Sequence, residues 1–187
     1  MKRKLFLLLT VLLMTKSIFS EEKIRRQQQF EVKDADENIF ALKEDVDKVV
    51  DMLGEPLKKE NLWAIYPEAG CGFYKIDYEN ISFLYYDNEN KIARIVIEGN
   101  EYKIVDNDIT VGSSYEEIIN AYGEPESSVA YFNENRTRNE IQLKYSTQGT
   151  ALSYFEVGSE YYFSITINID AETKTCSELF VTWRTPC

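Results

Sequence analysis

Apolar residues recur at helical spacing in two stretches of the chain, residues 42–56 and residues 111–125, which begin 69 positions apart. In each stretch they fall at positions i, i+3, i+4 and i+7, starting at Val46 and at Tyr115. This spacing predicts one apolar face of an α-helix. Both stretches end in Gly-Glu-Pro, in which Gly takes the left-handed turn that ends a helix and Pro prevents its continuation. The pattern predicts one structural unit that occurs twice.

Segments that alternate apolar and polar residues follow each predicted helix, as expected for half-buried strands. After the first helix these segments are residues 62–66, 73–78, 81–87 and 91–98, with a turn at 87–90 and a short strand at 101–105. After the second helix they are residues 128–132, 141–145, 150–156 and 161–170, followed by a closing strand at 178–184. We expect the four segments of the second set to correspond in order to the four of the first.

A helix followed by an antiparallel meander, made twice, predicts an α+β fold in which the helices pack on one face of the sheet. The two repeat units are predicted to span residues 39–106 and 107–187. The second helix has the better start, because Ser113 and Glu116 have the spacing of a capping box. Glu44 holds the matching place in the first helix and caps less well, so the first helix should fray more readily.

The first 20 residues have the pattern of a secretory signal peptide, with basic residues at positions 2–4, an apolar run at 5–14, and small residues at Ser17 and Ser20. A membrane anchor is the alternative, but this run is about half of the roughly 20 apolar residues that span a bilayer. We therefore predict cleavage after Ser20 and a periplasmic or extracellular product with no stable membrane insertion. Residues 21–38 lack apolar periodicity and are predicted to be a flexible linker.

Cleavage would leave 17 basic against 32 acidic residues, a net charge of −15, because the first 20 residues hold four of the 21 basic residues and no acidic one. Such a charge disfavours nucleic acid and anionic membrane surfaces, and it favours a basic protein partner. The alternative interpretation is that the charge only maintains solubility. The sequence does not predict the oligomeric state.

Several absences argue against catalysis. The chain has no histidine, which removes the commonest general base and metal ligand. It also lacks a P-loop, a nucleophile elbow and a dinucleotide-binding glycine pattern. The acidic cluster at residues 87–90 lacks the spacing of a calcium-binding loop and is predicted to be a turn. We predict a protein that is not an enzyme and has no catalytic residue, cofactor or metal; a carboxylate-based hydrolase of cell-envelope material is an alternative.

The helix motif resembles the repeat of the secreted β-lactamase inhibitor proteins and of the small lipoprotein of the outer-membrane β-barrel assembly machine. The matching residues are Gly112, Glu117, Ile118, Gly123 and Pro125, whereas the first copy has Lys43 where the pattern has Gly. The chain also lacks the lipidated cysteine of the lipoprotein group. The resemblance implies a non-catalytic envelope protein that binds another protein through its sheet, and a purely structural envelope module is a further alternative.

One face of the predicted sheet has the composition of an interface. Within residues 161–170, Tyr162, Ser164, Thr166 and Asn168 point away from the side predicted to face the helices. Tyrosine and arginine anchor protein interfaces through large contact areas with polar ends. The candidate partner-binding residues are Tyr86, Arg94, Phe155, Tyr162, Thr166, Phe180 and Arg184. The alternative is a solvated face, on which Tyr and Thr are favoured by strand propensity alone.

The chain has three cysteines, of which Cys176 and Cys187 bracket the last predicted strand and Cys71 lies between two glycines. An exported protein can keep disulfides, and a bond that pins a terminus is a common use. We predict a Cys176–Cys187 disulfide, although a strand of roughly 20 Å would separate the sulfurs unless residues 185–186 fold back. Pairing with Cys71 and three free thiols are the alternatives.

Overall fold

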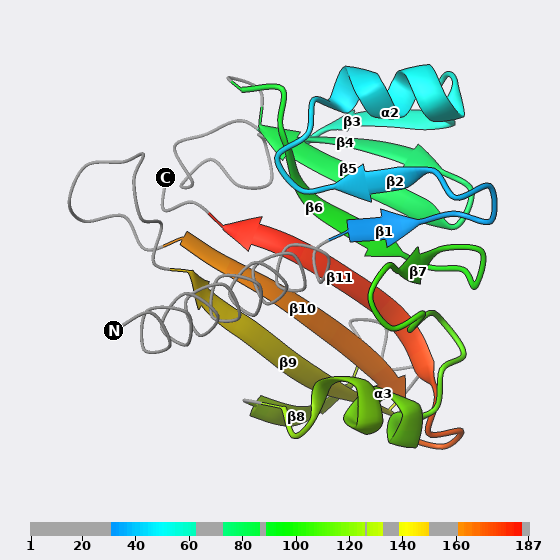
Figure 1. Ribbon diagram of the computed structural model, residues 1–187, viewed down its shortest axis with the longest axis vertical. Coiled ribbons are helices and arrows are strands. Elements are labelled where there is room, and N and C mark those ends of the chain that lie inside the picture. The colour runs from blue at the N-terminus through cyan, green and yellow to red at the C-terminus, as the bar shows by residue number, and fades with distance from the viewer. Residues whose placement is uncertain are drawn as a thin grey trace, which may run out of the picture.

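The computed structural model describes residues 31–62, 73–86, 89–125, 127–132, 139–149 and 161–184, and the structural statements below concern these ranges. They form two helices and two antiparallel sheets, an α+β fold that is rich in strands (Figure 1). The larger sheet has eight strands in the order β3-β4-β5-β6-β11-β10-β9-β8. The smaller sheet has three, in the order β2-β1-β7.

The strands of the large sheet from one edge to the other are β3 (Lys58–Asn61), β4 (Phe73–Tyr78), β5 (Ile81–Tyr86), β6 (Ile92–Ile97), β11 (Cys176–Arg184), β10 (Tyr161–Asp170), β9 (Asn139–Gly149) and β8 (Ser127–Phe132). The small sheet consists of β1 (Glu31–Lys33), β2 (Ile39–Ala41) and β7 (Lys103–Ile104). The helices are α2 (Val46–Leu53) and α3 (Tyr115–Tyr122). Among the described residues, neither helix is long and apolar enough to cross a membrane.

Both helices and the small sheet lie on the same side of the large sheet (Figure 1). The aromatic contacts agree, because Phe40 of β2 packs on Phe83 at 5.5 Å between ring centroids and Tyr122 of α3 packs on Tyr145 at 5.0 Å. Phe83 and Tyr145 belong to one row of registered residues that crosses the sheet through Ile95, Val181 and Ile165. The hydrophobic core therefore lies between this side of the sheet and the elements that cover it.

The first strand begins within the stretch predicted to be a flexible linker. Val32 of β1 is fully buried and pairs with Phe40 on one side and Ile104 on the other. The turn that follows is fixed by Asp34, whose Oδ1 accepts hydrogen bonds from the backbone N–H groups of Asp36 and Asn38 at 2.9 Å each. The predicted linker is wrong for residues 31–38, because a single buried valine gives no periodicity that a pattern can reveal.

The helix ends differ in part from the prediction. The capping box of α3 uses Ser114 and Glu117, one residue later than predicted: Ser114 Oγ accepts from the Glu117 N–H, and Glu117 Oε2 accepts from the Ser114 N–H at 2.7 Å. Ser113 Oγ instead accepts a bond from the Thr110 N–H at 3.1 Å. At the start of α2, Asp45 makes no side-chain capping bond. The predicted difference between the two helix starts is confirmed with Ser114 in place of Ser113.

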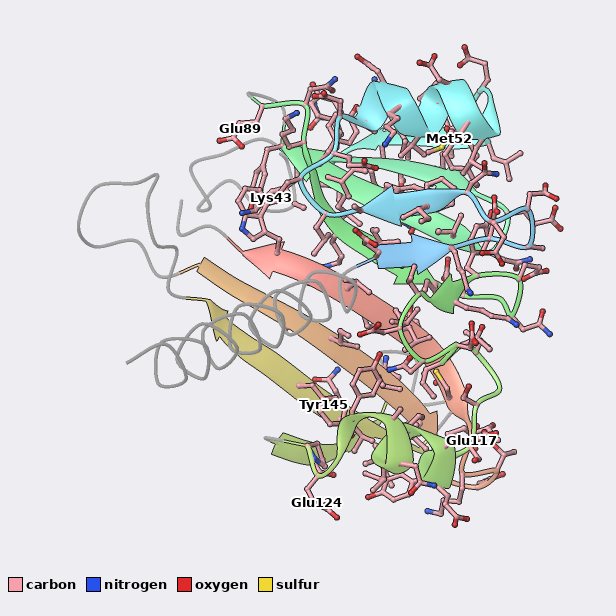
Figure 2. All side chains as sticks on the ribbon, in the orientation of Figure 1. Lys43, Met52, Glu89, Glu117, Glu124 and Tyr145 are labelled. Atoms are coloured by element: carbon pink, nitrogen blue, oxygen red, sulfur yellow. The ribbon has the colours of Figure 1, made fainter. Side chains whose placement is uncertain are left out.

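The two helices are joined to the large sheet by matching hydrogen bonds. Tyr78 Oη donates to the carbonyl oxygen of Gly54 at 2.9 Å, and Tyr145 Oη donates to that of Gly123 at 3.2 Å (Figure 2 labels Tyr145). The loop before α2 pairs with the β5–β6 hairpin, and the loop before α3 pairs with the β10–β11 hairpin. Before α2, Lys43 N donates to Ile92 O at 2.9 Å and Val46 N donates to Asn90 O at 3.0 Å. The matching bonds before α3 run from Gly112 N to Cys176 O at 2.8 Å and from Tyr115 N to Lys174 O at 2.9 Å.

Candidate binding surface

The side of the large sheet that faces away from α2, α3 and the small sheet is here called the open sheet face. No described helix or strand covers it (Figure 1). The strand register places side chains of this face in two rows that run across the strands. The first row is Lys58, Asp77, Ser82, Val96, Phe180, Thr166 and Lys144. The second is Glu60, Lys75, Leu84, Arg94, Thr182 and Ser164.

Three of the predicted binding residues meet at the centre of this face. Thr166 and Phe180 are register partners, and Arg94 is the register partner of Thr182, two residues beyond Phe180. The guanidinium carbon of Arg94 lies 5.9 Å from the centroid of the Phe180 ring, within the range of a cation–π contact. Arg94 is exposed, and Phe180 and Thr166 are half-buried. These three residues therefore lie next to one another on the open sheet face.

Tyr86 does not belong to the exposed surface. Its side chain is 5% exposed and packs against Phe73, at 4.7 Å between ring centroids, and against Trp183, at 6.1 Å. The expectation of an exposed Tyr86 is therefore corrected. The register between β5 and β6 shifts after Leu84, where Tyr85 pairs with Ile92 and Ala93 is skipped. Alternation assigns Tyr86 to one side of its strand, but it cannot show that the rings of Phe73 and Trp183 bury it there.

The other predicted residues are placed less fully. Tyr162 and Arg184 are register partners, and their backbone positions continue the row of Ser164 and Thr182 by two residues. Their side chains lie outside the described part of the chain, and so does Phe155. The predicted strand at residues 150–156 is also outside it, and β3 at Lys58–Asn61 precedes the segment predicted at 62–66.

The carboxylates in the two rows are neutralised within the face. Lys58 Nζ lies 2.6 Å from Glu60 Oε1, and Lys75 Nζ lies 2.7 Å from Asp77 Oδ1. The hydrogen bond from Lys58 lowers the pKa of Glu60 and correspondingly raises the pKa of Lys58. In the next row, Glu178 Oε2 accepts a hydrogen bond from Asn168 Nδ2 at 2.9 Å, and Asn168 Oδ1 accepts one from Gln142 Nε2 at 3.2 Å.

The structure contradicts the predicted disulfide. Cys176 is a free thiol that is 2% exposed, and its Sγ donates toward the carbonyl oxygen of Glu178 at 3.5 Å. Cys71 and Cys187 lie outside the described residues. Because β11 starts at Cys176 and runs to Arg184, its ends are about 26 Å apart. The three following residues reach back at most about 10 Å, whereas the Cα atoms of a disulfide lie within about 7 Å.

A lysine that the sequence did not single out lies at the edge of the core. Lys43 Nζ stands 4.5 Å from the centroid of a Trp183 ring, and burial lowers the pKa of Lys43 while the nearby Glu89 carboxylate opposes that shift (Figure 2). Its backbone φ is 69°, a left-handed conformation that Gly112 adopts at the start of the other helix with a φ of 92°. Lys43 thus accepts, before α2, a strained backbone conformation that a glycine adopts before α3.

In the ranges that the structure describes, no group of three or more acidic, cysteine or histidine side chains could hold a metal ion. No protein family, curated protein or solved structure matches the chain.

Proposed function

We propose that this chain is an exported, non-catalytic protein that binds a protein partner through its open sheet face. The observation that carries the proposal is the central cluster of Arg94, Phe180 and Thr166. Arginine and aromatic residues supply most hot spots of protein interfaces, because they combine a large contact area with directed polar groups. Here the guanidinium lies on the aromatic ring at 5.9 Å, and that contact limits the conformations of both side chains before a partner arrives.

The surroundings of this cluster also suit an interface. Val96, beside Phe180, is buried, with 6% of its surface exposed, whereas Leu84, beside Arg94, and Phe180 itself are half-buried and supply the apolar surface at the centre. Thr182 and Ser164 extend it with short polar side chains that lose little conformational freedom when covered. An apolar centre surrounded by polar residues is the usual anatomy of a protein interface.

The proposed architecture behind this surface is a duplicated unit, with α2-β3-β4-β5-β6 as the first copy and α3-β8-β9-β10-β11 as the second. The matching backbone bonds before each helix and the matching tyrosine bonds to Gly54 and Gly123 support it. In this duplication β10 is the equivalent of β5, and β11 is the equivalent of β6. This correspondence of strands differs from the one expected from the sequence. Val96 and Phe180 then hold equivalent positions in the two proposed copies. Because these two residues are also register partners, the twofold axis that would relate the copies passes between them.

The first 20 residues carry the part of the proposal that concerns export, because they have the pattern of a signal peptide. Its test is N-terminal sequencing of the protein recovered from its native host, which should begin near Glu21. Intact Met1 on protein from the cytoplasm would contradict both the location and the envelope partner. The resemblance to secreted inhibitor proteins supports the same location and remains a proposal.

Binding through the open sheet face can be tested by quantitative capture from a cell-envelope extract. The variant Thr166→Trp places a bulky ring at the centre of the face, at a strand position where aromatic residues are well tolerated. A true partner should be retained by the wild type and lost by Thr166→Trp, and it should then bind directly as a purified protein.

The matched control is Lys103→Glu, a charge reversal at an exposed position of β7 in the small sheet, on the other side of the large sheet. It should retain the partner. Captured proteins that bind Thr166→Trp as well as the wild type would place binding elsewhere and overturn the proposal.

A further inference from the structure

The two edge strands of the large sheet differ in charge. β3, at one edge, reads Lys-Lys-Glu-Asn, so nearly all of its residues are charged. β8, at the other edge, reads Ser-Ser-Val-Ala-Tyr-Phe and contains neither a charged residue nor a proline (Figure 1). Charged residues and prolines are the usual features that keep a sheet edge from pairing with a strand of another chain. Of the two edges of the described sheet, β8 is therefore the one that lacks this protection.

The strand register shows which backbone groups of β8 point out of the sheet. The Asp170 N–H donates to the carbonyl oxygen of Thr175, so the backbone groups of Asp170 face β11 and those of Ile169 face β9. Ile169 pairs with Ile141, and Ile141 in turn pairs with Ala130. Because backbone groups of successive residues alternate between the two sides of a strand, Ile141 bonds to β10 and Ala130 faces away from β9.

By the same alternation, Ser128 and Phe132 also turn their backbone N–H and C=O groups outward, and no described strand pairs with this side of β8. When two copies of an antiparallel strand pair about a twofold axis, outward residues must meet outward residues. One register pairs all three, with Ala130 opposite Ala130 of the second copy and Ser128 opposite Phe132. Each of these pairs can exchange two hydrogen bonds.

From this arrangement we infer that β8 pairs antiparallel with β8 of a second copy of the chain, which joins the two large sheets into one. The inference goes beyond the proposed function and does not depend on it. A second copy suits this edge because Ala130, whose side chain is small, lies at the axis, where a residue must face itself. The uncharged strand also lets two copies of a chain with 21 basic and 32 acidic residues meet without placing like charges opposite each other.

The experiment compares the self-association of the wild type with that of Ala130→Glu and Ala130→Lys. Sedimentation velocity of the purified proteins, over a series of concentrations, should show a dimer for the wild type. Either variant places two like charges opposite each other at the axis, so the dissociation constant of its dimer should rise about fivefold or more. An equimolar mixture of the two variants places opposite charges there and should restore the dimer.

The matched control is Lys59→Glu, a charge change on the other edge strand. The Leu62 N–H donates to the carbonyl oxygen of Phe73, so the backbone groups of Leu62 face β4 and, by alternation, those of Lys59 face outward as Ala130 does. Lys59→Glu should dimerise as the wild type does. A dimer that is weakened by Lys59→Glu and not by the Ala130 variants would place the contact at β3 and overturn the inference.

A wild type that stays monomeric at every concentration also overturns the inference, and so does a mixture of Ala130→Glu and Ala130→Lys that associates no better than either variant alone. Circular dichroism shows whether each variant keeps the fold. If an Ala130 variant does not, Ser128→Pro takes its place, because Ser128 is exposed and its N–H faces outward, so the change removes no bond to β9. Ser128→Pro should weaken the dimer, and a dimer as stable as that of the wild type would contradict pairing through β8.

Discussion

Gly54 and Gly123 hold a backbone conformation that glycine alone adopts without strain. Their φ and ψ angles are 80° and −163°, and 78° and −162°, an extended region of positive φ rather than the left-handed helical turn expected from the sequence. A Cβ at either position would meet no atom within 4 Å, so a substitution is opposed by backbone strain alone.

We therefore expect Gly123→Val to lower the free energy of unfolding by about 1 to 3 kcal/mol, and Gly54→Val to act similarly. Ala121→Val, at an exposed position of α3, is the matched control and should cost about 0.5 kcal/mol through helix propensity. Urea unfolding measures all three. An unchanged midpoint for Gly123→Val would show that this helix end is not constrained as the structure indicates.

Cys176 gives a prediction about pH. Burial raises the pKa of its thiol from 9.0 to about 12. The unfolded thiol ionises first, so its contribution to stability is fully present below about pH 9 and is lost as pH rises toward 12. The wild type should lose stability more steeply than Cys176→Ala over this range, in urea unfolding at a series of pH values. Burial also raises the pKa of Tyr145, to about 12, but that effect is common to both proteins.

At the scale of elements, the sequence pattern succeeded where apolar alternation is uninterrupted. The strands predicted at residues 73–78 and 161–170 match β4 and β10 at both ends. It missed β3, because Lys58–Asn61 contains no apolar residue: the strand pairs with β4 at the sheet edge and has an ion pair between Lys58 and Glu60. It placed the capping box one residue early because two serines and two glutamates satisfy the same spacing, and only the turn at Thr110 decides between them.

The two helix starts predict different responses to the same kind of change. Ser114→Ala removes the bond that Ser114 Oγ accepts from the Glu117 N–H, and it should cost about 1 kcal/mol of stability. Asp45 makes no side-chain capping bond, so Asp45→Ala removes only the ion pair to Lys91, at 2.8 Å. The Asp45 side chain is 58% exposed in that pair. It should cost about 0.5 kcal/mol or less. Equal losses in thermal unfolding would contradict the assignment of the caps.

At the scale of the whole molecule, the sequence predicted two units, which remain a proposal, but not which strands would join them. The junction is the pairing of β6 with β11, in which Leu179, Phe180, Val181 and Thr182 pair with Ile97, Val96, Ile95 and Arg94. Pairing between strands that are distant in the sequence depends on which strand edges remain unpaired after the local structure has formed. Local periodicity therefore cannot predict which of these strands pair. The same junction creates the candidate site, since Arg94 lies on β6 and Phe180 lies on β11. Sequence reasoning could name these residues, but it could not show that they meet.

This junction predicts that the two proposed units unfold together. Ile95 and Val181 are fully buried register partners at the boundary, and the core cluster includes residues of both units, from Val32 to Trp183. Separating the units would expose this surface, so a single cooperative transition is expected. Val181→Ala should lower stability by about 2 kcal/mol. Hydrogen exchange should then accelerate by the same factor in β5 and in β10, because the slowest amides of both strands exchange only through global unfolding. Acceleration confined to β10 and β11, or two separate transitions in urea, would show that each unit folds independently and that the Arg94–Phe180 cluster forms only after they dock.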